Sequence, residues 1–89
     1  MDFEWNRSKA RANERKHSVS FEEATEVFAD EYSSTVADPD HSIDEERFVI
    51  FGKSAGEKFL VVAFTERNGR IRLISARQMT RRERRAYEQ

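Results

Sequence analysis

The dipeptide Asn68-Gly69 is the feature that most restricts how this chain of 89 residues can fold. Both residue types tolerate a positive φ, so the pair favours the type I′ turn that joins two antiparallel strands. The flanking segments 59–67 and 70–76 are rich in β-branched and other apolar residues, as strands are. A two-residue loop would place Arg67 opposite Arg70 and thereby fix the register of the whole hairpin. The sequence thus predicts a β-hairpin whose two faces can be assigned residue by residue.

The predicted register gathers arginines on one face of this hairpin. Arg67 faces Arg70, and Arg72 lies next to them on the same face. Phe64 and Leu73 face each other on the opposite, core side. Like charges placed directly opposite each other are unfavourable in a bare sheet. A bound anion would relieve this repulsion; alternatively, the arginines extend into water or pair with acidic residues elsewhere in the chain.

Arg77 comes directly after this predicted strand and does not share that face. The register places Arg77 opposite Leu60, on the other side of the sheet from Arg72. The two arginines can therefore act in one site only if the strand twists or bulges near Ser75.

The remaining segments predict short helices and strands around the hairpin. Ser20 and Glu23 have capping-box spacing and open a helix that runs to about Ala29. Thr80 and Glu83 have the same spacing before a short terminal helix. A further helix is expected at residues 7–16, and further strands at residues 2–5, 32–36 and 47–53. Together these elements predict one α+β domain, residues 1–89: an antiparallel β-meander with two N-terminal helices packed on one face and a short C-terminal helix.

Composition limits the compartment and the kind of partner. The chain has no cysteine and no long apolar run, which predicts a soluble, cytoplasmic protein. Ten acidic residues and no basic ones lie from Ser18 to Glu46, whereas eight arginines and two glutamates lie from Arg67 to Gln89. A chain with this asymmetry is suited to binding a polyanion at its basic end, while its acidic segment could receive a basic partner.

The sequence has no pattern typical of metal or cofactor chemistry. His17 and His41 lack ligand spacing, and we expect His41 in a loop. Neither a glycine-rich phosphate loop nor a nucleophile elbow occurs, so we expect no cofactor and no metal. Side chains alone can support the attack of an RNA 2′-hydroxyl on the adjacent phosphate. His17 and Tyr87 are acid–base candidates for this reaction, although His17 could instead cap its helix and Tyr87 could anchor the terminal helix.

Several blocks of the chain resemble the BrnT family of toxins. The two most specific blocks are KHSVSFEEA, from Lys16 to Ala24, and RLISAR, from Arg72 to Arg77. The chain departs from the usual pattern at Ser18, where a glycine is common and would end the helix in a left-handed conformation. Shorter matches follow in order along nearly the whole chain, at Phe3-Glu4-Trp5, Lys9, Asn13, Val27-Phe28, Asp30, Glu46-Arg47, Thr65-Glu66-Arg67 and Glu83-Arg84-Arg85-Ala86-Tyr87.

The resemblance implies the toxin of a bacterial type II toxin–antitoxin system, with a RelE-like fold and a ribonuclease activity that arrests translation. It further implies a cognate BrnA-like antitoxin that covers the toxin, contacts DNA through a ribbon-helix-helix region and forms higher-order assemblies with it. From the residues alone, the alternative is a non-catalytic module that binds RNA and acts by occupancy.

The resemblance also gives weight to six candidate catalytic residues, namely His17, Glu23, Arg67, Arg72, Arg77 and Tyr87. Our hypothesis is that the first two arginines hold the scissile phosphate. The third arginine would stabilise transition-state charge or position the RNA. The histidine, the glutamate and the tyrosine compete for the roles of acid and base.

Overall fold

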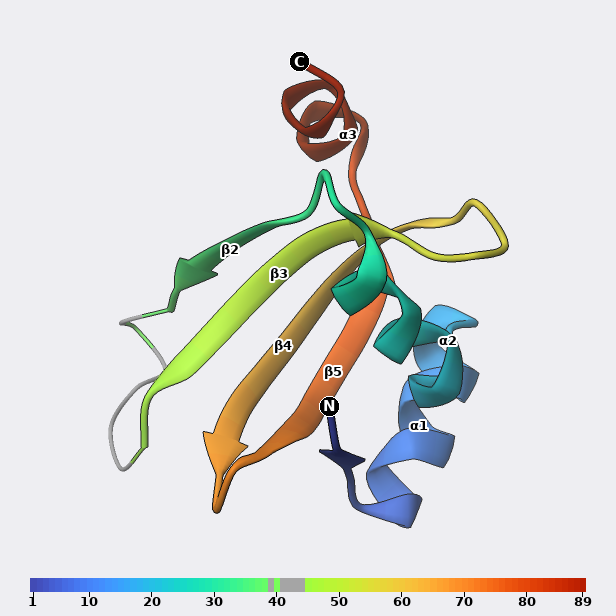
Figure 1. Cartoon of the computed structure of the whole chain (residues 1–89). Coiled ribbons are helices and arrows are strands. Elements are labelled where there is room, and N and C mark those ends of the chain that lie inside the picture. The colour runs from blue at the N-terminus through green and yellow to red at the C-terminus, as the bar shows by residue number, and fades with distance from the viewer. Residues whose placement is uncertain (39, 41–44) are drawn as a thin grey trace.

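The computed structural model of the chain describes residues 1–38, 40 and 45–89 (Figure 1). The expected loop position of His41 lies outside these residues. Within the described residues, no helix is both long and apolar enough to cross a membrane. The elements in chain order are strand β1 (Phe3–Glu4), helix α1 (Arg7–His17), helix α2 (Phe21–Thr25), the 3-10 helix η1 (Glu26–Ala29), strands β2 (Ser34–Ala37), β3 (Arg47–Lys53), β4 (Phe59–Arg67) and β5 (Arg70–Gln78), and helix α3 (Arg81–Tyr87).

The strands form a five-stranded sheet in the order β1-β5-β4-β3-β2. Strands β2 to β5 pair antiparallel in chain order, as the meander predicted. Strand β1 runs parallel to β5, with Phe3 opposite Ile71 and Glu4 opposite Arg72, so the sheet is mixed rather than wholly antiparallel. Parallel neighbours need a long crossover connection, and the chain between β1 and β5 provides one.

The turn between β4 and β5 has the predicted geometry. Asn68 and Gly69 have φ angles of 54° and 78°, both positive as a type I′ turn requires. Arg67 lies opposite Arg70, also as predicted. The tip of the hairpin therefore carries two facing arginines.

The predicted register fails further along this hairpin, at a β-bulge. Phe64 faces Leu73 as expected, but Ala63 faces Ser75, so Ile74 is an extra residue in β5. A bulge of this kind adds one residue to one strand and reverses the side-chain alternation beyond it. Every residue of β5 after the bulge consequently points to the face opposite the one predicted.

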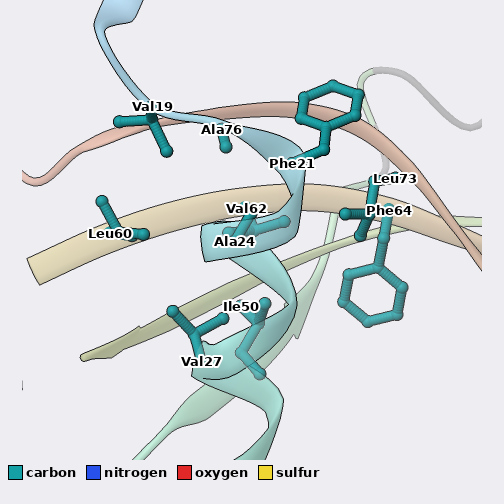
Figure 2. Close-up of a cluster of buried hydrophobic side chains, with 10 residues drawn as sticks. All are labelled: Val19, Phe21, Ala24, Val27, Ile50, Leu60, Val62, Phe64, Leu73 and Ala76. Atoms are coloured by element: carbon teal, nitrogen blue, oxygen red, sulfur yellow. The ribbon is translucent and has the colours of Figure 1, made fainter. Parts of the chain in front are cut away.

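Helices α2 and η1 cover one face of the sheet and form the core with it (Figures 1 and 2). Phe21, Ala24 and Val27 from these helices are fully buried against β3, β4 and β5. Gly52 of β3 allows η1 to approach closely, because a Cβ there would lie only 3.0 Å from Cβ of Val27. The buried apolar cluster drawn in Figure 2 consists of Val19, Phe21, Ala24, Val27, Ile50, Leu60, Val62, Phe64, Leu73 and Ala76.

Helix α1 runs beside β5 and is tied to it by Asn13, which is buried. The Asn13 amide nitrogen donates to the carbonyl oxygens of Val19 at 3.0 Å and Ala76 at 2.8 Å. Its amide oxygen accepts from the backbone N–H of Ala76 at 3.0 Å. The helix ends at Ser18, whose φ of 58° is left-handed and whose N–H donates to the carbonyl of Glu14. A serine thus adopts the conformation for which glycine is the usual residue.

The two predicted capping boxes differ in outcome. Ser20 caps α2 by accepting from the backbone N–H of Glu23, but the Glu23 carboxylate contacts Lys58 at 3.3 Å, so only half of that box is described. The predicted helix also changes to 3-10 geometry before it ends at Ala29. At α3 the box is complete, since the side chains of Thr80 and Glu83 each accept from the other's backbone N–H.

Candidate active site

The face of the sheet opposite the core is left uncovered by α2 and η1 (Figure 1). Side chains alternate between the two faces along each strand, so the register assigns the residues of this second face. We call it the open face. It comprises Arg47, Val49, Phe51, Val61, Ala63, Thr65, Arg67, Arg70, Arg72, Ser75 and Arg77.

Arginines gather on the open face at its hairpin end, and Arg67, Arg70 and Arg72 each contact a carboxylate. Arg67 binds Glu45 with both Nη2, at 2.6 Å from Oε1, and Nε, at 3.4 Å from Oε2. Arg72 donates to Glu4 Oε2 at 2.8 Å, and Arg70 lies 3.9 Å from the other oxygen of Glu4. The hydrogen bonds from Arg67 lower the pKa of the Glu45 carboxyl. The arginines are thus oriented by ion pairs in the free protein.

A small pocket of about 210 Å³ opens among these side chains. Four of its lining residues are cations and one is a carboxylate, so its lining carries a net positive charge. Such a pocket attracts phosphate groups, which guanidinium groups bind in a planar, bidentate manner. Its lining residues are Lys9, Glu45, Arg47, Thr65, Arg67, Arg72 and Ile74. We call these residues the basic cluster.

The bulge at Ile74 brings Arg77 to the open face, which corrects the predicted position on the core face. Arg77 lies opposite Val61, and Arg72 lies opposite Thr65, which is four residues further along the same strand. At the rise of a β-strand this corresponds to roughly 13 Å. The two arginines therefore share one face without touching, a separation that suits successive parts of an extended ligand.

The Arg77 guanidinium is held by α3. It donates to both oxygens of Glu83, at 2.8 Å and 3.0 Å, a bidentate ion pair. This pair, with the backbone N–H of Thr80, lowers the pKa of Glu83 to about 2. Helix α3 buries no residue fully, so this ion pair is one of its main attachments to the sheet.

Between the basic cluster and Arg77 most side chains of the open face are apolar. A hollow of about 320 Å³ spans four strands there. An aromatic side chain beside cations is suited to stacking of a nucleic-acid base, and Phe51 supplies one here. The hollow is lined by Val36, Ala37, Asp38, Val49, Phe51, Val61, Ala63, Ser75 and Arg77.

Tyr87 anchors α3 at the far end of this face. Its hydroxyl donates to Asp30 in a short hydrogen bond, and its ring packs edge-on against Phe59 with centroids 5.7 Å apart. Burial together with the Asp30 carboxylate raises the pKa of Tyr87 to about 12. The hydroxyl proton of Tyr87 is thus held in the hydrogen bond with Asp30. This contact fits the alternative in which Tyr87 anchors the terminal helix.

The other two acid–base candidates are not brought to the arginines. Glu23 belongs to α2, on the core side of the sheet, and contacts Lys58. His17 is the last residue of α1, beside β5. In the described part of the chain, no hydrogen bond or ion pair joins either side chain to an arginine of the open face.

Four carboxylates in or beside the site were missed by sequence reasoning: Glu4, Asp30, Glu45 and Glu83. The spacing of Thr80 and Glu83 predicts the helix cap but not the pairing of Glu83 with Arg77. Glu4 could have been found from the alternation of its strand, but its parallel pairing with β5 has no local signal in the sequence. No group of three or more potential ligands for a metal ion occurs among residues 1–38, 40 and 45–89.

The chain is similar to known proteins in sequence and in fold. The family model described as the ribonuclease toxin BrnT of type II toxin–antitoxin systems matches residues 5–83. The crystal structure of the Brucella abortus ribonuclease toxin BrnT is similar in fold, with a TM-score of 0.67 and 20% sequence identity over 91% of this chain and 99% of that one. No curated protein sequence matches the chain. Because the family model covers nearly the whole chain, this protein belongs to the BrnT family of ribonuclease toxins of type II toxin–antitoxin systems.

Proposed function

We propose that this toxin is a metal-independent endoribonuclease that arrests translation by cutting RNA on the open face of its sheet. The observation that carries the proposal is the placement of Arg67, Arg72 and Arg77 on one uncovered face, each oriented by a carboxylate. Fixed cations aimed at a developing negative charge are an effective means of stabilising a phosphoryl transition state.

In the proposed reaction the RNA 2′-oxygen attacks the adjacent phosphorus and the bond from phosphorus to the 5′-oxygen breaks. Arg67 and Arg72 hold the phosphate in the basic cluster, where it displaces part of their contacts with carboxylates. Arg77 contacts the RNA further along the chain. The products are a 2′,3′-cyclic phosphate and a 5′-hydroxyl.

The reaction needs a base for the 2′-hydroxyl proton and an acid for the leaving oxygen. Glu4 is our candidate for the base, since its carboxylate contacts Arg72 and is partly exposed. His17 remains a candidate acid on the family resemblance alone, since no described contact joins it to the arginines. Glu23, on the core side, and Tyr87, bonded to Asp30, are less well placed for either role.

The family implies an antitoxin partner, and we propose that it is a BrnA-like protein with a ribbon-helix-helix region. In this proposal the toxin contacts DNA only as part of its complex with the antitoxin. The complex in turn forms higher-order assemblies. An antitoxin that covers the open face would exclude RNA and so neutralise the toxin.

The proposed activity is tested by incubating the pure protein with end-labelled RNA in EDTA. We expect cleavage products that end in a 2′,3′-cyclic phosphate. Arg67→Ala and Arg72→Ala should each lower the rate by about 100-fold or more, as loss of a transition-state contact does. Arg85→Ala, in the exposed face of α3, is the matched control and should cleave normally.

Two results would contradict the proposal. Retained cleavage in the Arg67 and Arg72 variants would show that the basic cluster is not the site. Tight RNA binding without any product would favour the alternative, a module that acts by occupancy.

A further inference from the structure

Strand β2 forms an edge of the sheet that is unpaired in the described part of the chain. The sheet ends at β2, and all four of its residues are exposed. Soluble proteins usually protect such an edge with lysine, proline, a bulge or a covering segment, because a free edge invites pairing with another chain. The sequence of β2 is Ser-Thr-Val-Ala, which contains none of the protective residues.

The backbone groups that face outward can be assigned from the ladder between β2 and β3. The N–H of Asp38 donates to the carbonyl of Arg47 at 2.8 Å, next to the last residue pair of the ladder. Antiparallel residues alternate between hydrogen-bonded and non-bonded pairs. The N–H and C=O groups of Thr35 and Ala37 therefore point away from β3 and are available to a further strand.

A groove lies directly beside this edge. It has a volume of about 470 Å³ and separates β2 from α3. Tyr32 and Val36, with exposed fractions of 75% and 49%, both line it, so two large apolar side chains are exposed beside the same groove. Its other wall is formed by Arg82, Glu83, Ala86 and Tyr87 of α3. The edge thus offers backbone hydrogen bonds, and the groove beside it offers a place for apolar side chains.

The charge around the edge indicates which kind of chain would pair with it. The segment from Ser18 to Glu46, which contains β2, has ten acidic residues and no basic ones. Glu31 and Asp40, on either side of the strand, are exposed. Two copies of this toxin paired through β2 would bring two such acidic segments together, which is unfavourable. A basic partner is favoured instead.

We propose that β2 is the docking edge for the antitoxin, which adds an extended basic segment to the sheet as an additional strand. Apolar side chains of that segment enter the groove between Tyr32, Val36 and Tyr87. Recognition of this type derives affinity from main-chain hydrogen bonds and specificity from the side-chain pocket. Val36 also lines the apolar hollow of the open face, so a strand docked here borders the RNA site. The inference rests on the proposed function only in taking the antitoxin as the partner.

The test uses the protein encoded by the reading frame adjacent to the toxin gene, co-expressed and purified with the full toxin. Hydrogen exchange at the amides of Thr35 and Ala37 should slow markedly in the complex, because they become hydrogen-bonded. The amide of Ser18, far from β2 in sequence, serves as an internal reference. Unchanged exchange at both β2 amides in a stable complex would overturn the proposal.

A pair of variants provides the second measurement. Thr35→Pro and Ala37→Pro each remove an outward N–H and leave the β2–β3 ladder intact, and proline is tolerated at such edge positions. Each should weaken binding of the adjacent-gene protein by roughly three- to tenfold, as loss of one hydrogen bond does. Arg85→Ala is the control for general damage to the surface. Equal affinity in the proline variants, with circular dichroism unchanged, would contradict a docked strand.

The remaining outcomes separate the possible causes of failure. If the free toxin alone dimerises with slowed exchange at Thr35 and Ala37, a second copy occupies the edge and the proposal is wrong. Thr35→Pro, at a residue outside the lining of the apolar hollow, should still cleave RNA at the normal rate. If the wild-type toxin binds its partner through β2 but cuts no RNA, the proposed docking edge is supported. The proposed function is then wrong.

Discussion

Single side chains on the open face are oriented before any ligand is bound. Arg67, Arg72 and Arg77 each contact a carboxylate, so little rotamer freedom remains to be lost when a phosphate binds. The carboxylates must also be partly displaced, which opposes binding. Such a site discriminates against weak, monovalent anions and favours a polyanion that engages several arginines together.

The backbone at Ser18 is strained, and a substitution can relieve this strain. Its φ of 58° is unfavourable for a residue with a Cβ, and its side chain is exposed. We expect Ser18→Gly to raise the free energy of unfolding by about 0.5–1 kcal/mol, measured by urea denaturation. Ser8→Gly, inside α1, should lower it instead, because glycine is a poor helix former. Stabilisation by both changes, or by neither, would contradict this account.

The hydrogen bond from Tyr87 to Asp30 should stabilise the fold, and this stabilisation should be lost at high pH. Tyr87→Phe removes it and should lower the free energy of unfolding by about 1–2 kcal/mol near neutral pH. The folded protein raises the pKa of Tyr87 to about 12 from an ordinary 10.0, so it prefers the protonated form. This contribution is complete below pH 10 and is lost as the pH rises towards 12. Denaturation of both proteins from pH 8 to 11 measures it; a constant difference at all pH values would be inconsistent with the bond.

At the scale of elements, local patterns predicted much of the fold and only part of the site. The turn at Asn68-Gly69, the strand from Arg47 to Lys53 and the cap at Thr80 follow from short-range rules and are found as predicted. The bulge at Ile74 does not follow from short-range rules, because nothing in the neighbouring sequence distinguishes Ile74 from an ordinary strand residue. The same limit applies to the pairing of Glu4 with β5, which depends on contacts between distant segments.

Helix α3 depends on Glu83, which caps it and holds Arg77. Glu83→Gln should lower the free energy of unfolding by about 2 kcal/mol at pH 7, since it weakens a charge-assisted pair and the cap together. Folding lowers the pKa of Glu83 to about 2 from 4.5. Its contribution is therefore present above pH 4.5 and is lost as the pH falls towards 2.

Urea denaturation of the wild type and Glu83→Gln at pH 7 and at pH 3 measures this loss. Thr80→Ala is the matched control, because it removes the cap but leaves the pair of Arg77 with Glu83. The difference between the wild type and Thr80→Ala should change little with pH. A Glu83→Gln difference that stays constant down to pH 3 would rule out the ion pair as its source.

Across the whole molecule, the charges separate a basic face from an acidic flank. The basic cluster and Arg77 lie on the open face, and the acidic segment from Ser18 to Glu46 includes the free edge at β2. One small chain can therefore present surfaces of opposite charge to two partners. The edge at β2 and the apolar hollow share Val36, so the two surfaces meet there.

The salt dependence of RNA binding distinguishes arginines that contact phosphates directly from arginines that contribute only to the general electrostatic field. RNA with a 2′-deoxy residue at the cleavage position should bind without being cut, which isolates binding from chemistry. For single strands, each phosphate contact contributes a slope of roughly −0.7 to the logarithm of the binding constant against that of the salt concentration. If Arg67, Arg72 and Arg77 each contact one phosphate, replacing any of them with alanine should reduce the slope by about that amount. Arg85→Ala should weaken binding slightly and leave the slope almost unchanged. Equal slope changes in all four variants would mean that the open face holds RNA by its field alone, and the assignment of the scissile phosphate to Arg67 and Arg72 would then fail.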